Sequence, residues 1–234
     1  MAGKPRPRFV SIDGQGYDRH PIRTHCLKAG DDIAKVVEEY TRPHRQPGDW
    51  LAVSEKVVAV SQGRAVPESH IRVGWLARLL WRGVRKVPYG VGLRSPTSMQ
   101  CAINECGALR ILCAALVGFL GKVVGRRGDF YRIAGMQAAT IDAAHTSPLQ
   151  ADCVILGPKE PGKVAEAIRR ATGCEAAVMD VNDIGGSWVL GATDGVDRPL
   201  LERIMRDNPC GQKDEQTPVA IVRRVQEASN ESRA

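Results

Sequence analysis

The chain has 234 residues, enough for one large domain or two small ones with a hydrophobic core. Its 43% hydrophobic and 25% charged residues exclude collagen-like, low-complexity and mainly disordered proteins. The 33 Lys and Arg outnumber the 26 Asp and Glu, and the resulting net charge of +7 favours an anionic partner: a nucleic acid, a phosphate, a polycarboxylate or a membrane surface.

The cysteines and the apolar runs bear on the compartment. Seven cysteines without a Cys-x-x-Cys pair are typical of a reducing compartment, not of a disulfide framework or a structural zinc site. The longest strongly apolar run, residues 111–121, is shorter than the roughly 20 residues that span a bilayer. Residues 1–8 are basic, and no apolar signal-peptide segment follows them. We therefore expect a cytoplasmic protein without a membrane segment.

The first elements expected along the chain are a helix and a long strand. Residues 31–40 open with two aspartates and continue with apolar residues at helical spacing, which predicts a helix. Residues 46–49 have the composition of a turn. Residues 50–60 are rich in Val and Ala, which predicts a strand ending at residues 62–63.

Most of the positive charge lies in one window, residues 64–94, which holds seven bases and one acid. Arg78, Arg82 and Arg85 lie along one stripe of a predicted amphipathic helix that also carries two tryptophans. Three interpretations stay open: a solvated helix face, a charged collar beside a site for phosphates or several carboxylates, or a surface for nucleic acid or membrane. The last is the least favoured, because no recognised nucleic-acid motif accompanies the stripe.

A long apolar helix is expected next, over residues 97–120, because Ser95 and Pro96 form a good helix cap and first turn. Cys106 and Cys113 are seven residues apart on it, which places both on one core-facing side. The later elements are expected as strands at residues 130–134, 137–142, 151–156, 175–181 and 217–225, and as helices after Pro161 and at residues 199–206.

Strands and helices alternate without a regular β-α-β repeat, which predicts an α+β or mixed α/β protein with mixed sheets and packed helices. Residues 15–225 are expected to form the folded domain, with a division into two subdomains left open. Residues 1–14 are expected to be a flexible basic N-terminal segment and residues 226–234 a flexible tail.

The candidate chemical groups are acidic residues at the ends of apolar strands. The chain holds none of the common nucleotide-loop, hydrolase-elbow or zinc-protease motifs. Asp142 ends one expected strand, and Asp180, Asn182 and Asp183 end another. Oxygen ligands that converge from two strand ends suit Mg²⁺ or Mn²⁺, although such residues also form turns. His145 is a candidate for contact with metal or phosphate, or simply an exposed loop residue.

Several segments, taken in order over residues 19–224, resemble the coenzyme F-420 gamma-glutamyl ligase family. In that family, a proline precedes Gly-Asp-Asp-Leu, and a strand runs from Gly-Asp through Ser/Thr-x-Lys-Ile-Val to Glu-Gly-Arg. Two loops follow, Gly-Ile-Asp-x-Ser-Asn and Asp-Thr/Ser-x-Gly-Arg-x-Trp. The matching segments here are Pro21 with LKAGDDI at 27–33, GDWLAVSEKVV at 48–58 with QGR at 62–64, TIDAAH at 140–145 and NDIGGSW at 182–188.

This resemblance implies a gamma-glutamyl ligase-like α+β fold, an intertwined homodimer, and an acid–amino-acid ligase of coenzyme F-420 biosynthesis. Such an enzyme uses GTP and Mg²⁺ or Mn²⁺ to join L-glutamate to a small anionic carboxylate substrate. The resemblance gives Asp142 and Asp183 catalytic roles. It implies metal binding by Asp142, Asp180, Asn182 and Asp183, and nucleotide binding by Pro21, Ser54, Glu55, Lys56, Arg64 and His145.

The chain departs from the family pattern at functional positions. Ala59 and Val60 stand where the family has a Ser-Lys pair that helps to hold the nucleotide, which makes Lys56 and Arg64 the nearest replacement cations. Gly186 stands in place of the family's arginine, and His145 in place of an asparagine. The alternative functions are a non-catalytic protein on the same fold that binds an anionic metabolite or nucleotide, and nucleic-acid binding through residues 64–94.

Overall fold

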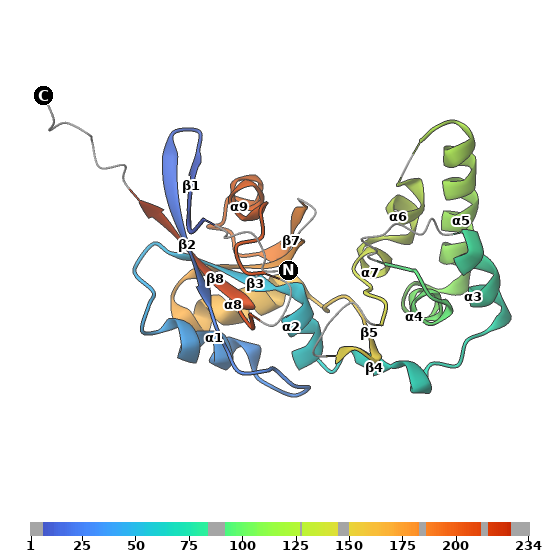
Figure 1. The fold of residues 1–234 in the computed structure, drawn as a ribbon, viewed down its shortest axis with the longest axis horizontal. Coiled ribbons are helices and arrows are strands. Elements are labelled where there is room, and N and C mark those ends of the chain that lie inside the picture. The colour runs from blue at the N-terminus through green and yellow to red at the C-terminus, as the bar shows by residue number, and fades with distance from the viewer. Residues whose placement is uncertain are drawn as a thin grey trace, which may run out of the picture. The chain divides into compact units, whose positions relative to one another are not determined.

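The computed structural model describes residues 7–83, 92–126, 128–144, 150–182, 186–211 and 215–225. They form the expected α+β fold, in which the chain divides into two compact units (Figure 1). We call the first the sheet unit, comprising Met1–Leu27, Asp31–Val58 and Glu160–Ala234, and the second the helical unit, comprising Lys28–Gly30 and Ala59–Lys159.

A mixed six-stranded sheet forms the centre of the sheet unit, in the order β1-β2-β8-β3-β6-β7. Strands β3 and β6 are parallel, and all the other neighbours are antiparallel. Strand β1 lies within the N-terminal segment that was expected to be flexible, which corrects that expectation for its residues. The strands are β1 Phe9–Ile12, β2 Gln15–Ile22, β3 Trp50–Ser54, β6 Glu175–Val181, β7 Ser187–Ala192 and β8 Val219–Val225.

Side chains alternate across this sheet and create a core on each face. Leu51 and Val53 of β3 are fully buried in the core that also contains residues of α1 (Ile33–Thr41) and α8 (Pro161–Thr172). Ala52 lies in the opposite core, with residues of α9 (Arg198–Met205). The sheet therefore lies between a layer of two helices and a layer of one (Figure 1).

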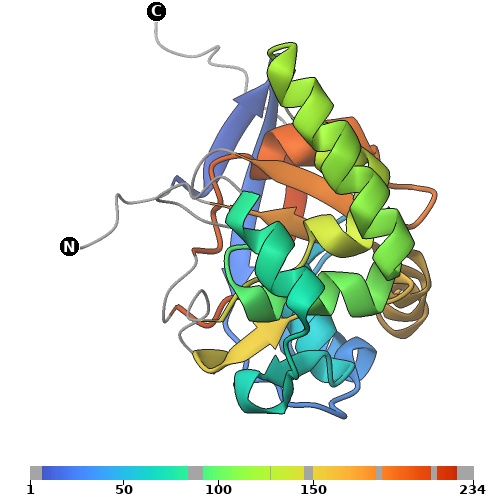
Figure 2. The same cartoon turned by 90° about the vertical axis from the view of Figure 1, so that its right-hand side faces the viewer.

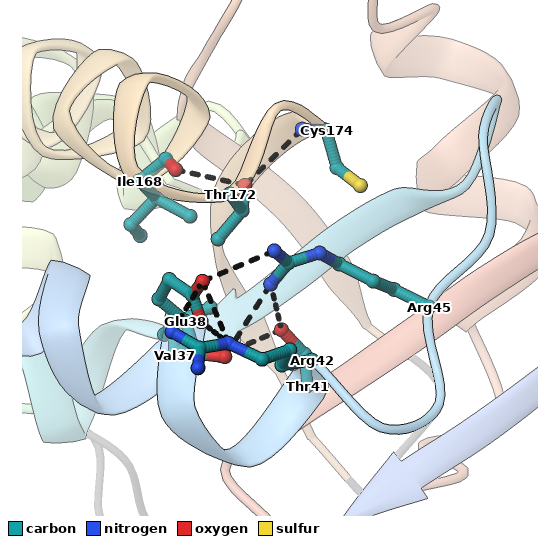
Figure 3. Close-up of polar contacts among 8 residues, drawn as sticks. All are labelled: Val37, Glu38, Thr41, Arg42, Arg45, Ile168, Thr172 and Cys174. Atoms are coloured by element: carbon teal, nitrogen blue, oxygen red, sulfur yellow. Dashed lines mark hydrogen bonds and ion pairs between the residues drawn. The ribbon is translucent and has the colours of Figure 1, made fainter.

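Helix α1 confirms the expected start after the aspartates, because the Asp32 side chain accepts hydrogen bonds from the backbone N–H groups of Ala34 and Lys35. Near its end, the Glu38 carboxylate accepts hydrogen bonds from Arg42 Nε at 3.1 Å and Arg45 Nη2 at 3.2 Å (Figure 3). The hydrogen bonds from Arg45 and Arg42 lower the pKa of Glu38. They tie the last turn of α1 to the loop that enters β3.

Helix α8 is tied to β6 in a similar way. Thr172 Oγ1 donates to Ile168 O at 2.8 Å and accepts from the backbone N–H of Cys174 at 3.2 Å (Figure 3). Gly173 lies between them with a φ of 75°, a left-handed conformation that suits a glycine at a helix end. The chain therefore turns directly from α8 into β6.

The prediction of a single strand over residues 50–60 is wrong for the second half of that range. The strand ends at Ser54, and α2 (Glu55–Ser61) follows without a loop. Val58, Ala59 and Val60 are consecutive and all buried, whereas a strand with one buried face would bury alternate residues. Burial from several sides therefore outweighs the strand propensity of the valines.

The helical unit has its own core, which is built mainly from helices and contains no residue of the two sheet-unit cores. Strands β4 and β5 form a short antiparallel pair in it. Its elements are β4 Ala65–Pro67, η1 Glu68–His70, α3 Trp75–Leu80, η2 Trp81–Gly83, α4 Pro96–Cys106, α5 Ala108–Val123, α6 Asp129–Ala134, α7 Met136–Ala139 and β5 Cys153–Ile155.

The long helix expected over residues 97–120 is broken in two. Ser95 caps α4 as predicted, but Gly107 has φ 85° and ψ 142°, and α5 leaves at 116° to α4 (Figure 2). Cys113 therefore lies on a different helix from Cys106 and is exposed, which corrects the expected shared core face. Among the described residues no single helix is long and apolar enough to cross a membrane, and only the bent pair α4 and α5 meets that length and composition together.

The two strands expected at residues 130–134 and 137–142 are also wrong, because helices α6 and α7 occupy this segment. Gly135 ends α6 with a φ of 90°, and its N–H donates to Tyr131 O. The same glycine that suggested a turn between strands thus separates two short helices.

The basic segment forms a shorter regular helix than its pattern indicates. Helix α3 ends at Leu80, and residues 84–91, which include Arg85, lie outside the described residues. Arg78 and Arg82 are exposed, as expected, but Trp75 and Leu79 are exposed as well.

Candidate functional site

Several of the predicted site residues lie at one edge of the sheet, in the sheet unit. Because β3 and β6 are parallel, with Ser54 paired to Met179, their carboxyl ends meet at the same edge. Strand β2 ends there too, since Ile22 and Val53 both pair with Val219 of β8. In open α/β sheets, ligands bind outside the carboxyl ends of strands. We call this edge, with Pro21, Ser54, Glu55, Lys56, Asp180 and Asn182, the carboxyl edge.

The β3 end of the carboxyl edge is anchored by its backbone. The backbone N–H of Ser54 donates to Pro218 O at 2.8 Å. The Ser54 side chain, at the last position of the strand, is half-buried. Glu55, which follows it, is buried, and Lys56 is half-buried in the first turn of α2. A hydroxyl, a carboxylate and an ammonium group therefore follow one another as the chain leaves the sheet.

The β6 end presents oxygen ligands. Asp180 is half-buried and pairs across the ladder with Trp188 of β7. Asn182 closes the connection to β7, because its Oδ1 accepts from Gly186 N at 3.0 Å and its own N–H donates to Gly186 O at 2.9 Å. Asp183 lies outside the described residues.

Trp188 is a candidate site residue to which the sequence pattern assigned no role. Its side chain is 51% exposed, an unusual position for so large an apolar group, and it lies beside Asp180. A Cβ at Gly186 would lie 2.3 Å from Cη2 of the Trp188 ring. Trp188 therefore fills the space beside Gly186, where the family has an arginine, and presents a flat aromatic face at the carboxyl edge. Its place in the matched NDIGGSW segment was the available signal.

The remaining predicted site residues belong to the helical unit, where Arg64 and Asp142 lie on either side of the β5 strand. Asp142 is buried and exchanges two backbone hydrogen bonds with Ile155, at 2.8 and 3.0 Å. Arg64 O accepts from Leu156 N at 3.0 Å on the opposite side of the strand. His145, the other candidate of this segment, lies outside the described residues.

The Arg64 guanidinium is held inside the helical unit. Its Nη2 donates to Glu105 Oε2 at 2.5 Å and its Nε to Gly157 O at 2.5 Å, and the Arg64 side chain is only 8% exposed. A buried guanidinium that bonds to both a carboxylate and a backbone carbonyl holds the segments that carry them together. In this arrangement, Arg64 is placed to position its neighbours.

A cavity of about 360 Å³ lies next to this ion pair in the helical unit. Glu105 belongs to both, because it pairs with Arg64 and lines the cavity. Burial raises the pKa of the Cys101 thiol in its wall to about 11, so that the thiol stays protonated at neutral pH and is a poor nucleophile. The other lining residues are Val66, His70, Ile71, Arg72, Gln100, Asn104 and Leu156, which sequence reasoning did not single out.

The predicted metal ligands are thus divided between the two units. Asp180 and Asn182 belong to the sheet unit and Asp142 to the helical unit. Within the described ranges, no three His, Cys, Asp or Glu side chains form a group that could hold a metal ion. The chemistry of the oxygen donors nevertheless fits a hard divalent cation, which takes carboxylate, amide and water oxygens.

Comparison with known proteins adds one match. A family model described as F420-0:Gamma-glutamyl ligase matches residues 21–196, about three quarters of the chain. The match begins at Pro21 and includes the carboxyl edge, Arg64, Asp142 and Trp188. No curated protein matches the chain.

Proposed function

The chain belongs to the F420-0:gamma-glutamyl ligase family, and we propose that it joins L-glutamate to a carboxylate substrate with consumption of GTP and a requirement for Mg²⁺ or Mn²⁺. The observation that carries this proposal is the carboxyl edge. There, the strand ends of β2, β3 and β6 bring a hydroxyl, an ammonium group and oxygen-bearing side chains to one edge of the sheet. These are the groups that phosphoryl transfer requires.

In the proposed reaction, a carboxylate oxygen of the substrate attacks the γ-phosphorus of GTP. The bond to the β-phosphate oxygen breaks, and GDP and an acyl phosphate form. The amine nitrogen of glutamate then attacks the acyl carbon, phosphate leaves, and the nitrogen loses a proton to solvent as the amide forms. Both steps move negative charge between oxygens, so that catalysis rests on positioning and on cationic or hydrogen-bonding groups.

The metal, when bound, would neutralise charge on the transferring phosphoryl group. Asp180, Asn182 and Asp183 of the sheet unit and Asp142 of the helical unit are the residues proposed to hold metal ions. Ser54 would donate a hydrogen bond to a phosphate oxygen, and Lys56 would supply the positive charge that Val60 lacks. The remaining assignments, which stay predictions, are contacts of Pro21, Glu55, Arg64 and His145 with the nucleotide.

Trp188 adds a further expectation to this proposal. Its exposed indole face at the carboxyl edge would stack on a flat ring, either the base of the nucleotide or a deazaflavin. Aromatic stacking of this kind contributes about 1–3 kcal/mol to the binding of a nucleic-acid base.

The first prediction concerns Asp180. Calorimetry with GTP and Mn²⁺, followed by phosphate release with glutamate and a deazaflavin precursor, should show binding and turnover by the unaltered protein. We expect Asp180→Asn to lower kcat about 100-fold, because it removes a negative oxygen ligand beside the reacting phosphate.

The matched control for this experiment is Asp194→Asn. Asp194 is exposed and follows β7 at the opposite edge of the sheet, where Thr193 N bonds to Ala176 O. We expect this variant to behave like the unaltered protein. Failure of the unaltered protein to bind any nucleotide would refute the ligase proposal.

A second candidate is a non-catalytic protein that binds an anionic metabolite or nucleotide on the same fold. It is favoured by the burial of Ala59 and Val60 at 1% and 6% exposure, and by the Trp188 ring that occupies the space beside Gly186. This function predicts nucleotide binding without turnover. It also predicts that Asp142→Ala leaves the affinity unchanged, whereas the ligase proposal predicts a loss of metal-dependent affinity.

A further inference from the structure

The cavity of about 360 Å³ lies wholly within the helical unit and has a size that suits a small-molecule ligand. One wall is a single face of α4, because its lining residues recur at helical spacing: Gln100, Cys101, Asn104 and Glu105. The facing wall comes from the segments of β4 and β5 and from residues 70–72. Cys101 and Leu156 are buried, whereas His70, Arg72 and Asn104 are exposed, so that the cavity runs inward from the surface.

A chain of hydrogen bonds fixes the amide of Asn104 as a donor in this wall. The backbone N–H of Gly74 donates to Gln100 Oε1 at 2.9 Å, which identifies the other end of that amide as Nε2. Gln100 Nε2 in turn donates to Asn104 Oδ1 at 2.8 Å. Because Oδ1 is already the acceptor of this bond, Asn104 presents its Nδ2 group with two N–H donors.

Arg72 brings a guanidinium group to the cavity. It belongs to the basic window of residues 64–94 and lies in the segment between η1 and α3. Within the described ranges, its side chain makes no hydrogen bond and no ion pair. A guanidinium group binds a carboxylate through two parallel N–H bonds. Arg72 is therefore able to bind a carboxylate without giving up a partner in the protein.

Glu105 provides the opposite charge. Its Oε2 accepts from Arg64 Nη2 at 2.5 Å, and Oε1 has no partner in the part of the chain that the structure describes. The Glu105 side chain keeps 22% of its surface exposed and lines the cavity. A carboxylate has acceptor sites on both oxygens, so that Oε1 can accept from an ammonium group. The cavity thus combines cationic donors with an anionic acceptor.

The rest of the wall is apolar. Val66 and Ile71 are half-buried and Leu156 is buried, and all three line the cavity. The protonated Cys101 thiol adds no charge to it. A ligand that satisfied the charged groups would therefore have an uncharged, aliphatic remainder.

We propose that this cavity binds a free amino acid with an aliphatic side chain, in its zwitterionic form. The carboxylate would pair with Arg72 and Asn104 Nδ2, and the ammonium group with Glu105 Oε1. The side chain would pack on Val66, Ile71 and Leu156. A second carboxylate, as in L-glutamate, would meet this apolar wall without an ammonium or guanidinium partner. The site is therefore distinct from the L-glutamate site of the proposed ligase reaction and does not depend on that reaction.

The second prediction tests the ligand class by calorimetry. L-leucine titrated into the full chain, without nucleotide or metal, should bind saturably to one site. Isocaproate is L-leucine without its ammonium group, and isoamylamine is L-leucine without its carboxylate. Each analogue leaves one charged group of the cavity unpaired, and we expect it to bind at least about 10-fold more weakly. L-glutamate should be excluded to a similar degree.

Two variants locate the site. Asn104→Asp keeps the bond from Gln100 but replaces the Nδ2 donors with a negative oxygen, and it should abolish binding of L-leucine. Arg72→Gln should weaken binding at least about 10-fold with an unchanged circular dichroism spectrum, because Arg72 has no partner to lose in the described structure. The matched control is Arg78→Gln, an exposed arginine of α3 that does not line the cavity, and it should bind like the unaltered protein.

Hydrogen exchange with mass spectrometry provides an independent readout of the position. Bound L-leucine should slow exchange in α4 and in residues 66–72, because a ligand stabilises the elements that hold it. The sheet unit should exchange at an unchanged rate. Protection confined to the sheet unit would show that L-leucine binds elsewhere.

Three further results would overturn the proposal. The first is an unaltered protein that does not bind L-leucine at about 10 mM, the range of the weakest specific sites. The second is Arg72→Gln or Asn104→Asp that binds as tightly as the unaltered protein. The third is isocaproate or L-glutamate that binds as tightly as L-leucine. Since the titrations contain neither GTP nor metal, failure of the ligase proposal would leave each of these outcomes unaffected.

Discussion

At the residue scale, Arg64 shows how structure changes the meaning of a sequence motif. As the end of a family-like segment in a basic window, it was expected to contact the nucleotide. The structure places its guanidinium between Glu105 and Gly157 O, mostly out of water, while the contact with the nucleotide stays a prediction. One of the basic side chains that make up the +7 net charge is therefore paired inside the protein.

The third prediction follows from this burial. Arg64→Met should lower the free energy of unfolding by about 2 kcal/mol, less than a fully buried pair would lose, because Glu105 still reaches solvent. Arg64→Lys should be nearly as harmful, since an ammonium group cannot serve both partners with the geometry of a guanidinium. Urea unfolding monitored by circular dichroism measures both variants.

A double-mutant cycle with Glu105→Gln separates the ion pair from the bond to Gly157 O. A stable Arg64→Met protein that has lost only nucleotide affinity would contradict the structural role and favour direct contact with GTP. The sequence could not distinguish these roles, because Glu105 is 41 residues away along the chain and Gly157 is 93.

At the element scale, local patterns predicted the helices and strands whose caps are encoded nearby. Asp32 caps α1 and Ser95 caps α4, as expected, and β6 has the predicted bounds. The errors occurred in two short apolar runs: α2, where consecutive residues are buried, and α6, where Phe130 and Tyr131 are half-buried and Ile133 is exposed. There the spacing of apolar residues fits strand and helix alike, and packing decides.

The candidate site was predictable to a similar extent. The family-like segment 48–58 located Ser54, and the acidic residues at the end of a predicted strand located Asp180; the parallel pairing of β3 and β6 brings these strand ends to one edge. The cavity beside Glu105 could not be predicted, because its walls come from segments with no shared motif. Side chains such as Asn104 acquire a common neighbourhood only when α4 packs against β5.

The fourth prediction concerns the close contact of α5 with α6. Gly121→Ala should destabilise the protein by about 2 kcal/mol, because the new methyl group meets the buried Asp129 carboxylate at 2.3 Å. Gly162→Ala in α8 is the matched control. A Cβ there meets nothing within 4 Å, and the helical position should make it neutral or stabilising by about 0.5 kcal/mol.

Thermal unfolding of the two glycine variants provides the measurement. Equal melting temperatures for Gly121→Ala and Gly162→Ala would show that α5 and α6 can separate without loss. The close contact with Asp129 would then not explain why a glycine stands at position 121.

At the scale of the whole molecule, the separate cores of the sheet unit and the helical unit give the fifth prediction. Urea unfolding followed by hydrogen exchange and mass spectrometry should show two transitions, because each unit buries its own apolar residues. Gly121→Ala and Arg64→Met should shift only the transition of the helical unit, and Gly162→Ala only that of the sheet unit. One coincident transition, shifted by all three, would contradict independent units.

The order of strands in the sheet has a consequence for synthesis on the ribosome. Strand β8, which comes last among the strands that the structure describes, lies in the middle of the sheet, between β2 and β3. The helical unit, by contrast, is complete once Lys159 has been added. While translation continues, β2 and β3 lack the strand that joins them, and their inner edges stay open. The nascent chain can therefore finish its helical unit first, whereas β2 joins β3 and β6 at the carboxyl edge only when β8 emerges between them.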